Sequence, residues 1–342
     1  MRTTNTIEAL VRPNILALQP YVTFRDSFTS ENYTLLDANE NPFGRYNRYP
    51  DSTQKRLKQK LAAINSISSD QISIGNGSDE LIDLIIKIFC EPKKDKIVVL
   101  NPSFAMYEFY ASINENAVIK LDLDTNFKLQ KEEFSRKIEN KNAKVLFLCT
   151  PNNPTGTSID DVQYYIKNFP GIVVVDEAYI EFSEQESALN LLSEYPNLII
   201  LRTLSKAYGM AGLRIGMAIS SPFITQLIQT VKSPYNVSEA NIENALQLLE
   251  NQIEIENGIQ QIKREKIRLQ NALKKLSCVQ KIYPSDANFF LIEFANCESI
   301  YSKLVEARIL TSKRFPSIPN ALRINVGSQK ENDILIKELS QL

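Results

Sequence analysis

The 342-residue sequence predicts an α/β protein, in which a mostly parallel sheet covered by helices is followed by a small α+β domain. Through the middle of the chain, apolar runs of four or five residues alternate with helical patterns. Short apolar runs without polar alternation are typical of strands that are covered on both faces. Their alternation with helices indicates a parallel sheet. After residue 276 the composition changes, which indicates the second domain.

The apolar runs supply the strands of the predicted sheet. They are Ile97–Leu100, Val145–Cys149, Ile172–Val175, Leu198–Leu201 and Ile215–Ile219. Each run is bounded by Pro, Asn, Asp, Gly or Ser, the residues that favour turns. Helices are predicted between the strands, for example at Asp79–Phe89 and Lys131–Ile138.

The C-terminal part of the chain has a different pattern. Residues 239–276 contain one glycine and no proline, which predicts one long helix or two in succession. Beyond them, strands are predicted at Asn288–Phe294 and Ala321–Val326, and helices at Glu298–Ala307 and Glu331–Leu342. The N-terminal segment shows no clear periodicity, and we expect it to pack across the two domains.

The composition excludes several classes of function. The sequence contains no histidine, which rules out Ser-His-Asp triads, Cys-His nucleophiles and His-based zinc sites. Acid–base chemistry must therefore come from Lys, Asp, Glu, Tyr or Cys. The formal net charge is −1, and no long basic run is present, so nucleic acid is not expected as a partner.

The cysteines and the absence of long apolar runs predict a cytoplasmic protein without a metal site. The four cysteines form no Cys-x-x-Cys pair, and most of them lie in apolar surroundings that suit reduced core thiols. The first residues lack the apolar stretch of a signal peptide, and no run approaches the ~18 apolar residues of a membrane span.

Polar side chains follow three of the predicted strands, where parallel α/β sheets bind ligands. Asn153 lies in the segment Pro-Asn-Asn-Pro-Thr-Gly after the second strand, and Asp176 and Tyr179 follow the third. Lys206 and Arg214 follow the fourth strand. Taken singly, these features are ordinary turns or solvated charges, but three strand ends together indicate one cleft.

Two nucleotide-binding interpretations fail on the sequence. The acidic strand end Val-Val-Val-Asp176 occurs in P-loop enzymes, but the chain has no Gly-x-x-x-x-Gly-Lys-Ser/Thr loop. The segment beginning Gly75-Asn-Gly77 resembles a dinucleotide-binding fingerprint, but Glu80 stands where the third glycine belongs.

The remaining chemistry suits pyridoxal phosphate. The Lys206 amine can form a Schiff base with the cofactor aldehyde. Asp176, at the end of a buried strand, can keep the pyridine nitrogen protonated so that the ring accepts electrons from the substrate's α-carbon. Tyr179 and Asn153 can hydrogen-bond the ring's O3′. A free lysine amine has a pKa of about 10.4 and is a poor base near neutrality, and conversion to the internal imine is the means of making Lys206 usable.

The cofactor phosphate needs positive charge and hydrogen-bond donors. Arg214 and the Ser205 hydroxyl can supply both. Gly77 and Ser78 open a predicted helix whose free backbone N–H groups suit a phosphate. Phe104 can lie flat on the pyridine ring, although a core aromatic residue is equally consistent with the local sequence.

A series of motifs is similar to one known family. The motifs are Asp37-Ala-Asn-Glu-Asn-Pro-Phe-Gly44, Arg48-Tyr-Pro-Asp51, Gly75-Asn-Gly-Ser-Asp-Glu80, Pro151-Asn-Asn-Pro-Thr-Gly156, Asp176-Glu-Ala-Tyr179, Ser205-Lys206, Gly212-Leu-Arg-Ile-Gly216 and Leu322-Arg-Ile-Asn-Val-Gly327. In this order, over nearly the whole chain, they resemble the fold-type I pyridoxal-phosphate aminotransferases, and among them the histidinol-phosphate branch.

The resemblance implies a homodimer with a large cofactor domain, residues 40–270, and a small domain formed by residues 1–39 and 271–342. It implies that L-histidinol phosphate and 2-oxoglutarate exchange an amino group in histidine biosynthesis. It also implies the roles given above for the cofactor residues, with Tyr49 reaching the neighbour's cofactor phosphate. Tyr21 and Arg323 resemble substrate contacts, with Arg323 binding a carboxylate or phosphate.

One position departs from the family pattern. The family has an arginine about a dozen residues before the Leu-Arg-Ile segment, and this chain has Ser312 there. Either Lys313 or Arg314 replaces it, or the substrate differs. The alternatives on the same fold are an aromatic amino-acid aminotransferase and a lyase of the threonine-phosphate decarboxylase type.

Overall fold

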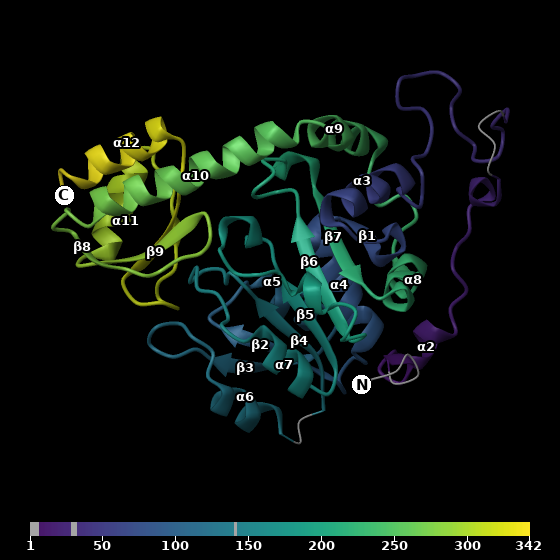
Figure 1. Ribbon diagram of the computed structural model, residues 1–342, viewed down its shortest axis with the longest axis horizontal. Coiled ribbons are helices and arrows are strands. Elements are labelled where there is room, and N and C mark those ends of the chain that lie inside the picture. Colours follow the sequence, from purple (N-terminus) through teal and green to yellow (C-terminus); the bar gives the residue numbers. More distant parts are fainter. Residues whose placement is uncertain (1–6, 29–32, 140–141) are drawn as a thin grey trace.

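The computed structural model describes residues 7–28, 33–139 and 142–342. Two sheets organise the described chain (Figure 1). A seven-stranded sheet lies at the centre of the molecule, and a four-stranded sheet is formed by the C-terminal part. The predicted α/β class, with a mostly parallel sheet and a smaller α+β unit, is confirmed.

The large sheet has the strand order β1-β7-β6-β5-β4-β2-β3. Its strands are β1 (Ile72–Asn76), β2 (Lys96–Asn101), β3 (Ala117–Asp122), β4 (Ala143–Cys149), β5 (Ile172–Asp176), β6 (Leu198–Thr203) and β7 (Ile215–Ser220). All five apolar runs form strands, but β7 runs antiparallel to both of its neighbours. The short segment between β6 and β7 contains no crossover helix, so the chain returns along the sheet in the opposite direction.

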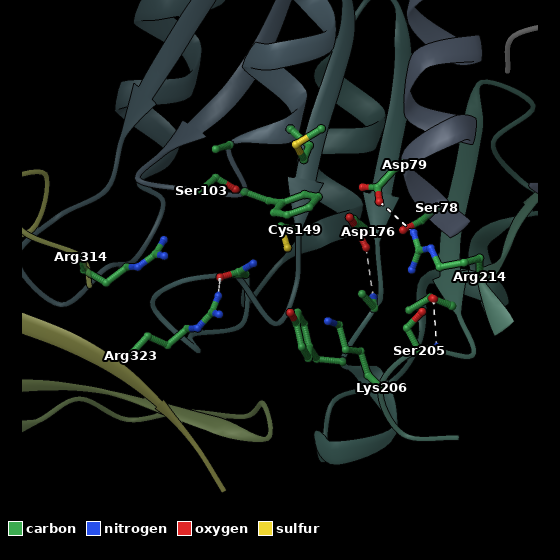
Figure 2. Close-up of a pocket in the computed structure, with 17 residues that line it drawn as sticks. Ser78, Asp79, Ser103, Cys149, Asp176, Ser205, Lys206, Arg214, Arg314 and Arg323 are labelled. Atoms are coloured by element: carbon green, nitrogen blue, oxygen red, sulfur yellow. Dashed lines mark hydrogen bonds and ion pairs between the residues drawn. The ribbon is translucent and has the colours of Figure 1, made fainter. Parts of the chain in front are cut away.

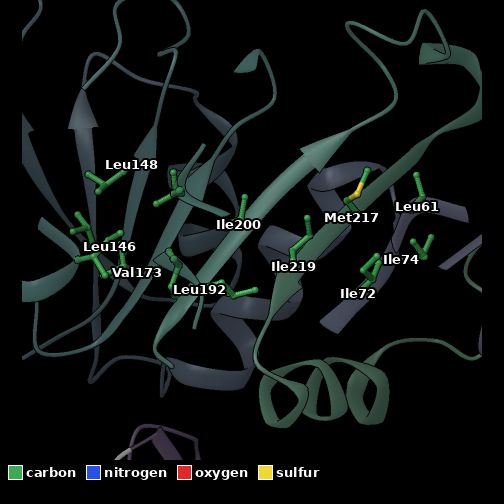
Figure 3. Packing of buried hydrophobic residues seen from close by; sticks show 14 of the residues in the cluster. Leu61, Ile72, Ile74, Leu146, Leu148, Val173, Leu192, Ile200, Met217 and Ile219 are labelled. Atoms are coloured by element: carbon green, nitrogen blue, oxygen red, sulfur yellow. The ribbon is translucent and has the colours of Figure 1, made fainter. Parts of the chain in front are cut away.

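Helices cover both faces of this sheet because successive residues of each strand point to opposite sides. In β2, Val98 and Leu100 pack in one buried cluster, whereas Ile97 and Val99 pack in the other. Figure 3 shows part of the first cluster, where Leu61 lies near Ile72 and Ile74. The helices of the first face are α3 (Lys55–Asn65), α6 (Lys131–Ile138), α7 (Val162–Asn168) and α9 (Glu239–Leu249). Those of the second face are α4 (Gly77–Phe89), α5 (Met106–Ile113) and α8 (Pro222–Val231).

The predicted helical stretch 239–276 forms two helices, α9 and the 22-residue α10 (Gln252–Leu273). The chain turns at Glu250 and Asn251, and the Asn251 side chain caps α10 by accepting a hydrogen bond from the Glu254 N–H. In Figure 1, α10 leads from the large sheet to the small one. The two-helix alternative is therefore the correct one.

The small sheet is antiparallel throughout, with the order β10-β11-β9-β8. Its strands are β8 (Val279–Ile282), β9 (Phe289–Phe294), β10 (Ser312–Lys313) and β11 (Ala321–Asn325). The helices α11 (Cys297–Glu306) and α12 (Gln329–Leu339) pack on it together with the end of α10. The predicted strands and helices of this region are present, with boundaries shifted by a few residues.

The N-terminal residues contact the large sheet's second face. Ile7, Val11 and Ile15, the last in α2 (Pro13–Leu16), are buried against α4 and α8. The Arg12 N–H donates to the Ile88 carbonyl at 3.0 Å. The grouping of residues 1–39 with the small domain stays a prediction, and these particular contacts do not support it. Within the described ranges, no helix is long and apolar enough to cross a membrane.

The described residues between 18 and 50 form an extended arm, fixed near its end by Glu40. The Glu40 carboxylate accepts hydrogen bonds from Arg25 at 2.6 and 2.9 Å, from Arg48 at 2.7 Å and from the Tyr49 N–H at 2.6 Å. The bonds from Arg25 are the main cause that lowers the pKa of Glu40 to about 2. The arm is therefore ordered by ion pairs while many of its apolar side chains stay exposed.

Candidate active site

A cavity of about 360 Å³ lies where both sheets contribute side chains (Figure 2). Nine of the predicted site residues line it: Ser78, Phe104, Asn153, Asp176, Tyr179, Ser205, Lys206, Arg214 and Arg323. The prediction that these strand-end residues share one cleft is confirmed. Gly77 is buried next to Ser78, at the start of α4.

The parallel strands bring the floor of the cavity together through their register. Cys149, the last residue of β4, lies beside Asp176, the last residue of β5, and Asp176 lies beside Leu201 of β6. The turn that follows β6 then carries Ser205 and Lys206 to the same edge of the sheet. Residues far apart in the sequence therefore meet because the strands end at one level.

Asp176 is a buried carboxylate, 3% exposed. One oxygen accepts a hydrogen bond from the Tyr107 hydroxyl at 2.6 Å, and the other accepts one from the Ala178 N–H at 3.1 Å. Burial raises the pKa of Asp176 to about 6, although the Tyr107 hydrogen bond opposes the change. Among the described residues, no basic side chain forms an ion pair with it. The site thus holds an acid that lacks a cationic partner.

Lys206 faces this acid from the opposite wall of the cavity (Figure 2). Its Nζ lies 5.7 Å from the centre of the Tyr179 ring. Burial lowers the pKa of Lys206, and the charge of Arg323 lowers it further, while Asp176 acts in the opposite direction. Tyr179 is itself buried and packs edge-on against Phe289 at 5.2 Å. Its pKa is raised, mainly by burial.

A second wall is formed by the N-terminus of α4 and Arg214. The Gly77 N–H donates to the Arg214 carbonyl at 2.8 Å, and Arg214 Nη2 lies 3.2 Å from Asp79 Oδ2. Gly77 has a φ of +74°, and a Cβ there would collide with the Arg214 guanidinium. Gly216 allows β7 to approach the backbone of Gly77 and Ser78 equally closely. These glycines keep a cation beside a helix N-terminus that has no side-chain cap.

Two arginines line the far end of the cavity, Arg323 in β11 of the small sheet and Arg314 directly after β10. Arg323 of β11 donates to the side-chain oxygen Oδ1 of Asn153, and Arg314 donates to the Ser312 hydroxyl. The Nε atoms of both arginines are buried without a hydrogen-bond partner. Burial lowers the pKa of Arg314, and the charge of Arg323 adds to this effect. Neither arginine forms an ion pair with a described acidic side chain.

Lys313 is directed elsewhere. Its Nζ lies 4.2 Å from the centre of the Phe315 ring and 5.9 Å from that of Tyr301, and it does not line the cavity. Since Lys313 and Arg314 are adjacent in an extended segment, their side chains point to opposite sides. Of the two basic residues that follow Ser312, Arg314 is the one that faces the cavity.

Three predicted site residues are absent from the cavity lining: Gly77, which adjoins it through Ser78, and two tyrosines that lie away from it. Tyr21 and Tyr49 are on the N-terminal arm, 73% and 50% exposed, and Tyr49 stacks on Tyr235 at 4.5 Å. Within one chain neither residue reaches the cavity lining, and their roles stay predictions.

Sequence reasoning missed Tyr107, which donates to Asp176. It is fully buried, and its ring stacks on Phe147 at 4.7 Å and meets Phe104 edge-on at 5.6 Å. Its position one turn after Phe104, on a helix that follows a strand, was the available signal. Nothing local pointed to a residue 69 positions away in the sequence.

The described residues contain no group of three or more Cys, Asp or Glu side chains placed to hold a metal ion. The cavity instead combines a lysine of lowered pKa, a buried acid and several arginines. This combination suits covalent capture of a carbonyl compound, together with binding of anionic groups at both ends.

Comparison with known proteins places these features in a family. Residues 27–339 match the family described as aminotransferase class I and II. The chain is 43% identical over 341 residues to a histidinol-phosphate aminotransferase of Parabacteroides distasonis, covering 98% of this chain and 99% of that protein. It is 44% identical to the Flavobacterium psychrophilum protein of the same name, with 98% and 99% covered.

Solved structures agree in fold. The histidinol-phosphate aminotransferase of Clostridium acetobutylicum superposes with a TM-score of 0.79 at 26% identity, covering 86% of this chain and 90% of that one. The Sinorhizobium meliloti enzyme, solved in complex with pyridoxal-5′-phosphate, gives a TM-score of 0.80 at 23% identity, with 89% of each chain covered. At that identity the second likeness concerns the fold.

Proposed function

The chain belongs to the aminotransferase class I and II family, and from this we propose that it transfers the amino group of L-histidinol phosphate to 2-oxoglutarate. The products are imidazole-acetol phosphate and L-glutamate, and the reaction is a step of histidine biosynthesis. The observation that carries this proposal is one cavity that joins a lysine and a buried acid to two arginines without acidic partners. The names of the relatives, which are about 40% identical over nearly the whole chain, support the same reaction.

The cavity residues fit the cofactor pyridoxal phosphate. The buried Asp176 carboxylate lacks a cationic partner among the described residues, and a protonated pyridine nitrogen would provide one. Lys206 would hold the aldehyde carbon covalently. The phosphate would be held by Arg214, Ser205 and the α4 N-terminus at Gly77 and Ser78. When bound, the cofactor supplies an electron sink for the negative charge left at the substrate's α-carbon.

The protein's own groups then move and hold the protons. Burial lowers the pKa of Lys206, which favours its amine as the base that would take the proton from the substrate's α-carbon. Asp176 would keep a proton on the pyridine nitrogen of the cofactor, and Tyr107 holds the Asp176 carboxylate in place. Tyr179 and Asn153 would donate hydrogen bonds to O3′, and Phe104 would cover the ring.

The two arginines at the far end of the cavity define the anionic end of the substrate. Arg323 would bind a phosphate or carboxylate, and Arg314 would supply the second cation that the family pattern places at Ser312. The Ser312 hydroxyl accepts a hydrogen bond from Arg314, which orients the guanidinium toward the cavity. A pair of unneutralised arginines favours a substrate with a phosphate dianion over one that ends in an aromatic ring.

The proposed assembly is a homodimer, formed through the N-terminal arm. The arm exposes Tyr21, Phe24, Leu36 and Phe43 at 73–91% of their surface, and burial of these apolar side chains against a second copy would stabilise the dimer. In a dimer, Tyr49 would reach the neighbour's cofactor phosphate and Tyr21 would contact the substrate. The four cysteines are free and buried, which supports the reducing environment of the cytoplasm.

The half-reaction spectrum tests the proposed function. Holoenzyme mixed with L-histidinol phosphate, without an oxo acid, should lose the absorbance of the aldehyde form and gain that of the amine form. 2-Oxoglutarate should then restore the first spectrum. Carbon dioxide release without an oxo acid would indicate a decarboxylase instead. A faster half-reaction with phenylalanine than with histidinol phosphate would indicate an aromatic aminotransferase.

A further inference from the structure

The first turn of α4 carries two carboxylates next to the proposed phosphate site. Asp79 and Glu80 follow Gly77 and Ser78 directly, and Ser78 and Asp79 line the cavity. A helix N-terminus attracts a phosphate, but two negative charges in the same turn repel a dianion. An effective phosphate site therefore requires that both carboxylates be held and neutralised.

Asp79 is neutralised from the cavity side. Its Oδ2 lies 3.2 Å from Arg214 Nη2, and Figure 2 shows this pair beside Ser78. Arg214 lies at a φ of +51° and its carbonyl accepts the Gly77 N–H, so its position is tied to the start of the helix.

Glu80 is held on the opposite side, away from the cavity lining. Its Oε2 accepts a hydrogen bond from the Asn76 N–H and another from Asn236 Nδ2 at 2.7 Å. Asn236 lies in the segment between α8 and α9, and its Nδ2 also donates to the Ile74 carbonyl at 3.0 Å. This amide group fixes Glu80 to the end of β1.

A buried lysine stands behind Asn236. Lys232, at the end of α8, is 4% exposed, and its Nζ donates to the side-chain oxygen Oδ1 of Asn236 at 3.1 Å. The same ammonium donates to Gln54 Oε1 at 2.7 Å and to the Ser52 carbonyl at 3.2 Å. A buried ammonium is costly unless it is hydrogen-bonded and offsets a negative charge. The Asn236 amide bridges Lys232 to Glu80, with its carbonyl toward the cation and its N–H toward the anion.

The bridge also joins the arm to the phosphate site. Ser52 and Gln54 follow Tyr49 closely in the sequence, and Tyr235, the neighbour of Asn236, stacks on Tyr49. The elements that carry or adjoin these residues, α3, β1, α4 and α8, pack against one another (Figure 1).

We propose that Lys232 and Asn236 are positioning residues that neutralise and hold Glu80, so that the N-terminus of α4 can bind the cofactor phosphate. The inference rests on the proposed function, because it assumes pyridoxal phosphate as the ligand. Neither residue lines the cavity, so both act through Glu80.

The test first adds a negative charge at position 236 and then exchanges the acid and the amide between positions 236 and 80. Asn236→Asp places a second carboxylate against Glu80, and the dissociation constant of pyridoxal phosphate should rise about tenfold. The double variant Asn236→Asp with Glu80→Gln exchanges acid and amide, and the amide introduced at position 80 can donate to the new acid. Its dissociation constant should return to within about twofold of wild type.

A second pair of variants removes the cation. Lys232→Met should weaken cofactor binding to a similar extent, and adding Glu80→Gln should restore most of it, since no carboxylate then needs neutralising. Lys58→Met is the matched control, because Lys58 is a partly buried lysine of α3 whose charge acts on Asp51. It should leave cofactor binding unchanged.

Binding is measured by spectroscopic titration of cofactor-depleted protein, and folding is checked by circular dichroism. If wild type fails to bind pyridoxal phosphate, the proposed function itself is wrong. If wild type binds but the single variants bind equally well, or Glu80→Gln rescues neither, only the role of Lys232 and Asn236 is overturned. The Asn236→Asp pair decides the matter even if Lys232→Met does not fold.

Discussion

The two ends of the cavity are built in different ways. The floor, around Asp176, lies on parallel strands of one sheet, and both carboxylate oxygens already have hydrogen-bond donors. The far end, around Arg314 and Arg323, comes from the antiparallel sheet and the residue directly after β10, and two buried Nε atoms there lack partners. Buried polar groups without partners call for an explanation, and a ligand supplies one. The hydrogen bonds of Asp176 are thus already formed within the protein, whereas those of the two arginines would be completed only when a substrate binds.

The largest expected effect concerns Lys206, which faces the Asp176 floor of the cavity. Lys206→Ala should abolish the absorbance of the lysine-bound cofactor and reduce turnover by at least about 10⁴-fold, because both the covalent link and the base are lost. Lys263→Ala, on the surface of α10, is the control and should change neither. If Lys206→Ala keeps both the absorbance band and turnover, the assignment of this lysine is wrong.

Replacement of Asp176, the acid on the floor of the cavity, should have the second-largest effect. Asp176→Ala should give folded protein that binds cofactor but turns over about 10³-fold more slowly, because no carboxylate stabilises the protonated pyridine nitrogen. Steady-state kinetics and the absorbance of the bound cofactor measure the two parts separately. Near-normal rates would contradict the electron-sink role and with it the contrast between the two ends.

The pH dependence of the cofactor-free protein probes the same acid. Because burial raises the pKa of Asp176 from 3.8 to about 6, its protonated form adds stability below pH 4, which is lost as the pH rises to 6. The loss amounts to about 3 kcal/mol at 1.36 kcal/mol per pKa unit. Asp176→Asn should therefore gain stability relative to wild type over this range in urea unfolding.

Asp122, an acid at the surface, should contribute to stability with the opposite pH dependence. The hydrogen bond from Asn101 lowers the pKa of Asp122, so its contribution is present above pH 4 and is lost as the pH falls. Asp122→Asn should therefore be less stable than wild type above pH 4, and the difference between the two should shrink as the pH falls below 4. Parallel pH curves for wild type and Asp176→Asn would show that Asp176 ionises normally.

The smallest expected effect lies at the substrate end. Arg314→Ala should raise KM for histidinol phosphate about tenfold and leave kcat within about twofold, because one charge-assisted hydrogen bond is lost in ground and transition states alike. Lys313→Ala is the adjacent control and should have no effect. If Lys313→Ala raises KM and Arg314→Ala does not, the wrong cation has been assigned.

The local sequence predicted the large sheet well because its strands are short, apolar and bounded by turn residues. It could not predict that β7 is antiparallel, since the run Ile215–Ile219 looks like its parallel neighbours. Nor could it locate β1 or β3, whose patterns were not singled out. Strand direction depends on the connection and on which edge remains free, not on the composition of the strand.

The sequence by itself determined which residues carry the chemistry of the cavity. Lys206, Asp176 and Arg214 follow apolar runs closely, and strand ends in a parallel sheet meet wherever the register places them. The tertiary structure alone decided which of Lys313 and Arg314 faces the cavity, that Tyr107 holds Asp176, and that Lys232 stands behind Glu80. The contacts of Tyr107, Glu80 and Arg323 join segments 69 to 170 residues apart, and side-chain direction at such a distance is set by packing.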